Sequence, residues 1–244
     1  IVSDVTSAER LEQTRRDYVA NVSHELRTPL TAMRALIEPL RDGLVKTEEQ
    51  RQQIYDVVLR ETMRLSRLVN DMLELSRLQS GTASLSRSVF APLPLFNLIH
   101  ETYSAYAEDY QQTFVYDVPE DLPSVWGNPD RTQQVLIVLL DNAFKYTPEG
   151  GVVTLSACAE GDIVRVRVRD TGVGIPEADM PRIFERFYRV DKARSRAAGG
   201  TGLGLSIVQD TVKKRGGTVS AANRPNGGAV FTVRWPEAEG GDHS

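Results

Sequence analysis

The chain has 244 residues, which is enough for one or two domains with a buried core. Its hydrophobic fraction of 41% and charged fraction of 25% are those of an ordinary globular protein, and a net charge of −4 gives no indication of nucleic-acid binding. The single cysteine, Cys158, excludes a disulfide framework. No apolar run approaches the roughly 20 residues that a membrane helix requires.

A long amphipathic helix is predicted around His24. Apolar residues recur every three or four positions on one stripe, at Val19, Val22, Leu26, Leu30, Met33, Ile37 and Leu40. His24 lies off that stripe, so its imidazole is expected to face solvent with a free nitrogen lone pair at neutral pH. The carboxylate of Glu25 is expected to reach the Nδ1–H of the ring and leave Nε2 as a nucleophile. Pro29 is expected to kink the helix just past His24.

A His–Glu pair on a helix is by itself usually a solvated surface pair. Here eight consecutive residues, 23–30 with the sequence SHELRTPL, resemble the phosphoacceptor segment of sensor histidine kinases, the two-component family. The resemblance implies that His24 is phosphorylated by ATP and passes the phosphoryl group to an aspartate of a response regulator, with Glu25 assisting. Thr28 shares the face of His24, and in relatives such a residue positions a water that dephosphorylates the regulator.

A second long helix is predicted to follow a short loop. Gly43 is typical of a helix C-terminus, and Thr47 with acids behind it is typical of an N-cap. The stripe of this helix is Ile54, Val58, Glu61, Leu65, Leu68, Met72, Leu75 and Leu78. One antiparallel hairpin cannot bury both stripes, so a homodimer that forms a four-helix bundle is expected. The alternative is a bundle within one chain, but no third or fourth long helix is predicted nearby.

The second half of the chain predicts an α/β sandwich, with a sheet on one side and helices on the other. Strand-like runs are expected at Ser88–Ala91, Phe114–Val118, Val152–Cys158, Ile163–Arg169, Thr218–Ala222 and Ala229–Trp235. Helices are expected at Pro94–Tyr110, Pro129–Tyr146 and Leu203–Arg215. The fold class is therefore multidomain: an all-α hairpin followed by an α/β sandwich.

Two polar clusters of this half have the chemistry of a nucleotide site. Asn142 and Lys145 share a helix face, and an amide oxygen suits Mg²⁺ while an ammonium suits phosphate. Asp170 ends a strand and can accept a hydrogen bond from an exocyclic amine, and Gly172 and Gly174 let the backbone approach a ligand. Without context, the first cluster is usually a cap and a solvated charge, and the second is often only a turn.

Two further clusters follow in the chain. Arg189 ends an aromatic segment and can stabilise a transferring phosphoryl group, and residues 190–200 have the composition of a mobile lid. The run 199–205, GGTGLGL, precedes a helix, so its backbone N–H groups and the helix dipole can cradle an anion. No lysine follows as in a P-loop, and no strand–turn–helix unit contains the run as in a dinucleotide fingerprint.

Together the four clusters resemble the ATP-binding domain of histidine kinases, which is shared more distantly with gyrase, Hsp90 and MutL ATPases. The resemblance implies that Asn142 holds Mg²⁺, that Lys145 and Arg189 contact phosphates, that Tyr146 flanks the nucleotide and that Asp170 reads the adenine amino group. It implies a nucleotide-binding role for further residues, which are Gly172, Gly174, Thr201, Gly202, Leu203 and Gly204.

The resemblance also sets the expected organisation of the chain. Residues 1–16 are expected to be a connector from an upstream sensor domain, and the strand-like run 1–6 is either the last strand of that domain or a frayed terminus. The expected parts that follow are the phosphotransfer hairpin 17–80, the linker 81–88, the ATP-binding domain 89–236 and a disordered tail 237–244. The chain is expected to be the cytoplasmic portion of a membrane-anchored bacterial sensor, with any membrane contact through segments absent from it. Its expected partners are a second copy and the receiver domain of a response regulator.

One departure from the family pattern keeps alternatives open. Many relatives have a second polar residue one turn before the Mg²⁺ ligand, and here that position is Val138, which cannot ligate metal or orient water. The first alternative is therefore a catalytically inactive dimer that only docks a response regulator. The second is a gyrase- or Hsp90-like ATPase without a phosphoenzyme, against which the string at 23–30 and the missing acid at Val138 both argue.

Overall fold

The computed structural model describes residues 2–80, 88–191 and 200–237. The chain forms two compact units, residues 1–73 with 191–201 and residues 74–190 with 202–244. The predicted linker at 81–87, most of the predicted lid at 192–199 and the predicted tail at 238–244 lie outside the described residues. Within the described residues, no helix combines the length and the apolar character that crossing a membrane would require.

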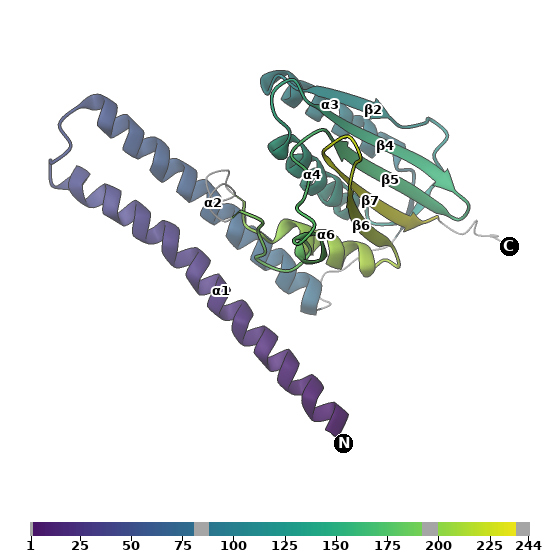
Figure 1. Cartoon of the computed structure of the whole chain (residues 1–244), viewed down its shortest axis with the longest axis horizontal. Coiled ribbons are helices and arrows are strands. Elements are labelled where there is room, and N and C mark those ends of the chain that lie inside the picture. The colour runs from purple at the N-terminus through teal and green to yellow at the C-terminus, as the bar shows by residue number, and fades with distance from the viewer. Residues whose placement is uncertain (1, 81–87, 192–199, 238–244) are drawn as a thin grey trace. The chain divides into compact units, whose positions relative to one another are not determined.

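Two long helices, α1 (Val2–Arg41) and α2 (Glu48–Ser80), form the predicted hairpin (Figure 1). The loop between them contains Gly43, whose φ of 69° lies in the left-handed region that glycine adopts without strain. The hydroxyl of Thr47 accepts a hydrogen bond from the N–H of Gln50 at 3.2 Å, so Thr47 is the N-cap of α2 as predicted.

The start of α1 differs from the strand expected at residues 1–6. Helix α1 begins at Val2, so the strand expected at residues 1–6 does not form over the described part of that run. A β-branched run is only weakly committed to a strand without a neighbour to pair with, whereas extending an existing helix adds one hydrogen bond per residue. The helix also continues through both Pro29 and Pro39.

The second unit contains the predicted alternation of strands and helices. Its elements in chain order are β1 (Ser88–Phe90), α3 (Leu93–Asp109), β2 (Thr113–Asp117), β3 (Val125–Gly127), α4 (Pro129–Tyr146), β4 (Val152–Glu160), β5 (Ile163–Asp170), the 3₁₀ turn η1 (Met180–Arg182), α6 (Gly204–Lys213), β6 (Thr218–Asn223) and β7 (Ala229–Pro236). The sequence did not predict β3 and η1.

A mixed five-stranded sheet in the order β2-β4-β5-β7-β6 is the centre of this unit, and β1 pairs with β3 in a separate two-stranded sheet. Strands β2 and β4 are parallel, and the other neighbours in the large sheet are antiparallel. Helices α3, α4 and α6 lie on one face of the sheet (Figure 1). Along β5, Val164, Val166 and Val168 are buried while the residues between them are half-exposed, so one face only is packed. The predicted α/β sandwich is confirmed.

The core beneath α4 is built on Phe144, which is 1% exposed. Its ring stacks on Tyr103 at 5.5 Å between centroids and lies 5.4 Å from Tyr106 and 5.6 Å from Phe114. The hydroxyl of Tyr103 donates to Asp141 at 2.7 Å. Burial, and then the nearby carboxylate, raise the pKa of Tyr103 above its ordinary value, so this hydroxyl keeps its proton and ties α3 to α4.

Replacing Phe144 by Ala is expected to lower the free energy of unfolding by about 3–5 kcal/mol, because a large ring leaves a cavity that the sheet and helices cannot fill. Both tryptophans, Trp126 and Trp235, lie in the second unit, so their fluorescence in urea follows its unfolding. The control is Leu98→Ala, since Leu98 is 50% exposed on α3 and its loss is expected to cost within about 0.5 kcal/mol. Equal losses for both variants would contradict this account of the core.

Candidate functional site

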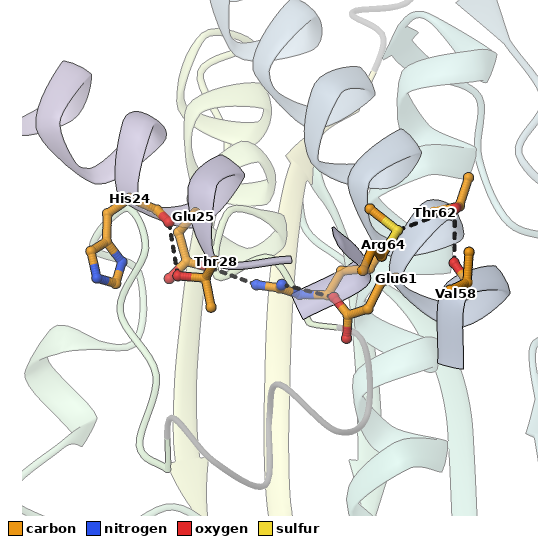
Figure 2. A network of polar contacts seen from close by, with 8 residues as sticks. His24, Glu25, Thr28, Val58, Glu61, Thr62 and Arg64 are labelled. Carbon is orange, nitrogen blue, oxygen red and sulfur yellow. Dashed lines mark hydrogen bonds and ion pairs between the residues drawn. The ribbon is translucent and has the colours of Figure 1, made fainter. Parts of the chain in front are cut away.

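The imidazole of His24 is exposed on α1, as the stripe of apolar residues predicts (Figure 2). Within the described part of the chain, no group makes a hydrogen bond to the ring. The hydroxyl of Thr28, one turn further on, donates to the backbone carbonyl of His24 at 3.0 Å. His24 and Thr28 therefore share one helix face, and the ring nitrogens remain open to a reaction partner.

The carboxylate of Glu25 lies elsewhere than expected. It accepts a hydrogen bond at 2.6 Å from the guanidinium of Arg64 on α2, and not from the imidazole beside it (Figure 2). The predicted contact between Glu25 and the ring is therefore not formed in this structure. An ion pair with an arginine is stronger than a hydrogen bond from a neutral imidazole, and Glu25 points to the interior of the hairpin while His24 points away from it.

In the second unit, Asp170 at the end of β5 is held in a fixed orientation. Its Oδ1 accepts two backbone N–H groups, from Gly172 at 2.9 Å and from Ala229 at 3.1 Å. Burial raises the pKa of the carboxyl, and the N–H groups of Ala229 and Gly172 and the charge of Arg224 offset part of that rise. Among the described residues no partner engages Oδ2, so this oxygen can accept a hydrogen bond from a ligand amine.

The end of α4 lies directly against the loop after β5. A Cβ at Gly172 would be 2.3 Å from the carbonyl oxygen of Tyr146, so only glycine fits there. The same carbonyl accepts the N–H of Val173 at 3.4 Å. Asn142 is half-buried in the last turns of α4, and the ammonium of Lys145 lies 5.3 Å from the centroid of the Tyr146 ring. The structure therefore brings the two predicted clusters, from α4 and from the loop, together.

Residues at the end of β6 and in the turn to β7 fix this loop, and the sequence did not predict them as part of the site. The amide of Asn223 accepts the N–H of Ile175 at 2.8 Å and donates to the carbonyl of Ile175 at 2.6 Å. Gly228 has a φ of 83°, and a Cβ there would lie 2.1 Å from the carbonyl oxygen of Asp170. The turn-forming run 223–228 (NRPNGG) was the available signal, but it indicates a hairpin and not a site.

The glycines before α6 serve packing as well as any ligand. The carbonyl of Gly202 accepts the N–H of Phe187 at 2.8 Å, and both residues have positive φ, of 74° and 62°. A Cβ at Gly204 would lie 3.0 Å from Cγ1 of Val138, so α6 and α4 pack closely at this point. The side chain of Leu203 is fully buried, which leaves only its backbone for a ligand.

Three further predicted residues lie in other segments. Thr201 groups with the first unit, and its hydroxyl donates to Asp71 of α2 at 2.6 Å. Arg189 is half-buried in the segment after η1. Gly174 has a φ of 71°, and a Cβ there would lie 3.1 Å from the amide oxygen of Asn223.

Two family models match separate parts of the chain. Residues 14–81 match the His Kinase A (phospho-acceptor) domain, and residues 127–239 match the Histidine kinase-, DNA gyrase B-, and HSP90-like ATPase family. The chain belongs to the sensor histidine kinase family. His24 lies in the first matched segment of this histidine kinase chain, and Asn142 and Asp170 lie in the second.

Relatives of this histidine kinase chain are similar over nearly its whole length. It is 39% identical to sensor histidine kinase WalK of Bacillus subtilis (strain 168) over 241 residues, which are 98% of this chain and 39% of WalK. It is 37% identical to sensor protein kinase WalK of Staphylococcus aureus over 97% of this chain and 57% of that protein. The chain therefore spans between two fifths and three fifths of the length of these relatives.

Solved structures of histidine kinases have the same fold. Histidine kinase ThkA in complex with response regulator protein TrrA gives a TM-score of 0.75 at 26% identity, covering 91% of this chain and 61% of that chain. Full-length ShkA in complex with AMPPNP gives 0.65 at 32% identity, covering 91% and 46%. Histidine kinase AdeS of Acinetobacter baumannii gives 0.71 at 24% identity, covering 88% and 98%.

Replacing Asp170 by Asn tests the role of its free oxygen. The amide oxygen can still accept the N–H groups of Gly172 and Ala229, which leaves an NH₂ donor facing any ligand amine. The raised pKa means that the ionised carboxyl costs stability at neutral pH, so removing its charge is expected to preserve or raise the melting temperature. Affinity for an adenine nucleotide is expected to fall at least about tenfold in calorimetry, because a buried donor is left unpaired. Unchanged affinity would remove Asp170 from the site.

Proposed function

We propose that this chain is an ATP-dependent protein histidine kinase that phosphorylates its own His24 and transfers the phosphoryl group to an aspartate of a response regulator. The observation that carries the proposal is the exposed imidazole of His24 on α1, to which no described residue makes a hydrogen bond, together with Oδ2 of Asp170, which no described residue engages. An accessible nitrogen nucleophile and an adenine-type site are the two parts that such a reaction needs.

The chemistry follows from neutral imidazole. The lone pair of His24 Nε2 forms a bond to the γ-phosphorus while the bond from that phosphorus to the β,γ-bridging oxygen breaks, and ADP leaves. The ring becomes cationic, and its Nδ1 proton is stabilised by, or passes to, the carboxylate of Glu25. Lys145 and Arg189 supply positive charge to the phosphates, and positioning provides most of the rate enhancement.

Asn142 fits as the protein ligand of a Mg²⁺ ion that accompanies ATP. Its amide is half-buried on the face of α4 that it shares with Lys145, and it makes no hydrogen bond among the described residues. Within the same residues, no group of three or more His, Cys, Asp or Glu side chains is placed to hold a metal. Mg²⁺ commonly takes one protein ligand or two and completes its shell with phosphate oxygens and water, so a single amide is sufficient.

The relatives support both partners of the reaction. The ShkA structure contains the ATP analogue AMPPNP, and the ThkA structure contains the response regulator TrrA. By that similarity we infer that this chain binds ATP through its second unit and a receiver domain through its hairpin.

A homodimer is part of the proposal. Large apolar side chains of the hairpin remain exposed in the single chain, and they include Val19, Leu30 and Ile37 on α1 and Leu59, Met63 and Leu73 on α2. A second copy can cover these residues and complete a four-helix bundle. Light scattering is expected to give twice the mass of one chain, and a monomer at micromolar concentration would contradict this arrangement.

Radiolabelled ATP tests the reaction at His24. Wild-type chain is expected to acquire label that is stable to alkali and lost in acid, as phosphohistidine is, and His24→Gln is expected to acquire none. His24 is exposed, so the substitution leaves the core intact. The matched control is His100→Gln, which replaces a histidine of α3 in the second unit and is expected to retain full labelling.

The same assay separates the alternatives. An inactive docking protein would bind the receiver domain but acquire no label, and Val138 is the feature that favours it. A gyrase-like ATPase would release inorganic phosphate at equal rates with and without His24. Either result would overturn the kinase proposal.

A second activity is proposed for Thr28, as part of the same function. We infer that its hydroxyl, on the face of His24, positions a water that dephosphorylates the bound regulator. Thr28→Ala is expected to leave autophosphorylation within about twofold of wild type and to slow regulator dephosphorylation by on the order of tenfold or more. Thr62→Ala is the control, because Thr62 makes the same backbone bond on α2, to Val58. Equal loss of both activities in Thr28→Ala would contradict the separation of roles.

A further inference from the structure

The side chain of Arg224 extends from the turn between β6 and β7 to the end of β5. Its Nη1 donates a hydrogen bond to the main-chain carbonyl of Asp170 at 2.5 Å, and the residue is half-buried. Two backbone hydrogen bonds close the turn. The N–H of Arg224 donates to the carbonyl of Gly228 at 2.9 Å, and the N–H of Gly227 donates to the carbonyl of Arg224 at 3.2 Å. The guanidinium is therefore attached to a fixed main chain.

This contact joins two strands that are not neighbours. In the sheet, β7 lies between β5 and β6, so Arg224 spans the start of β7 to reach Asp170. A Cβ at Gly228, just before β7, would lie 2.1 Å from the same carbonyl oxygen that Arg224 binds. The N–H of Ala229, the first residue of β7, donates to Oδ1 of the Asp170 side chain at 3.1 Å. One turn therefore holds both the main chain and the carboxylate of Asp170.

The other elements around this carboxylate bring little charge to it. The residue opposite Asp170 on β4 is Val153, which is apolar. At the end of α4, the ammonium of Lys145 lies 5.3 Å from the centroid of the Tyr146 ring. Among the described residues, Arg224 is the charged side chain that stabilises the ionised form of the Asp170 carboxyl.

Arg224 stabilises this charge without occupying the oxygen that a ligand would use. Burial raises the pKa of the Asp170 carboxyl, and the N–H groups of Ala229 and Gly172 and the charge of Arg224 offset part of that rise. The guanidinium bonds the main-chain carbonyl, and within the described chain it makes no ion pair with the carboxylate. Because Oδ1 already accepts two N–H groups, a proton would enter on Oδ2 and turn the free acceptor into a donor.

We propose that Arg224 is a positioning residue for nucleotide recognition, which fixes the main chain of Asp170 and keeps Oδ2 an acceptor for the amino group of adenine. This inference rests on the proposed function, because it requires an adenine nucleotide in the second unit. The acceptor is present above the pKa of the carboxyl and is lost as pH falls through it. Removing Arg224 raises that pKa, so the loss of binding moves to higher pH.

Calorimetry of AMPPNP with Mg²⁺ on the full chain, at pH values of about 7.5 and about 5.5, tests this role. Arg224→Gln is expected to weaken binding about fivefold at the higher pH, because the main chain of Asp170 is released. The factor is expected to be larger at the lower pH, because more of the carboxyl is protonated. The titration of the nucleotide itself is common to all variants and cancels in the ratio to wild type.

Two further variants separate charge from position. Arg224→Lys keeps the charge and is expected to keep the pH dependence of the wild type. Arg234→Gln is the matched control, since Arg234 is a half-buried arginine of β7 that lies opposite Arg165 on β5, five residues before Asp170. It removes the same charge from the same unit, and it is expected to leave the affinity unchanged at both pH values.

Carbon-13 NMR of the Asp170 carboxyl without nucleotide gives a reading independent of binding. Its pKa is expected to rise in Arg224→Gln and to stay at the wild-type value in Arg224→Lys and Arg234→Gln. Equal weakening at both pH values with an unchanged pKa would mean that Arg224 only braces the turn. Unchanged affinity would remove Arg224 from the site, and either result overturns the inference.

The test also covers a variant that does not fold and a chain that does not bind nucleotide. Arg224→Ser, which places a residue common in turns at this position, repeats both measurements if Arg224→Gln does not fold. If the wild-type chain does not bind AMPPNP, the proposed function fails. The pKa of the carboxyl then still supports or overturns the effect of Arg224 on Asp170.

Discussion

The nucleotide half of this chain depends on one close approach between two main chains. The carbonyl of Tyr146, at the end of α4, lies where a side chain at position 172 would begin. Because Gly172 has no Cβ, the loop after β5 can lie directly on the end of α4. That contact joins the end of the helix that contains Asn142 and Lys145 to the loop that follows Asp170. The loop itself is fixed from a third direction by Asn223, which binds both backbone groups of Ile175.

Asp170 illustrates how such a site is kept ready. Two backbone N–H groups hold one carboxylate oxygen in place, and among the described residues the other oxygen has no partner. Burial raises the pKa of this group, which is a cost to folding that the hydrogen bonds only partly offset. A polar group held in this way has little reorganisation to undergo when a ligand arrives.

The phosphoacceptor half follows a different principle. His24 is exposed, whereas its neighbour Glu25 is withdrawn into an ion cluster with Arg64. Adjacent residues on a helix point about 100° apart, so one can face solvent while the next faces the partner helix. Val138 affects both the chemistry and the packing of its unit. It stands where the family pattern has a polar residue, and its side chain fills the space beside Gly204 where α6 packs on α4.

The sequence by itself determined the elements and the residue types of this protein. Period and capping residues located α1, α2 and α4, because helix formation depends on neighbours a few positions away, and the strings around His24 and Asp170 indicated the chemistry. The sequence did not predict β3, the hold of Asn223 on the loop or the capture of Glu25 by Arg64. These contacts join residues that are 39 to 48 positions apart or depend on a pairing partner, so no local pattern encodes them. Only the packed structure decided them, since an ion pair or a close backbone contact exists only when both segments have already been placed.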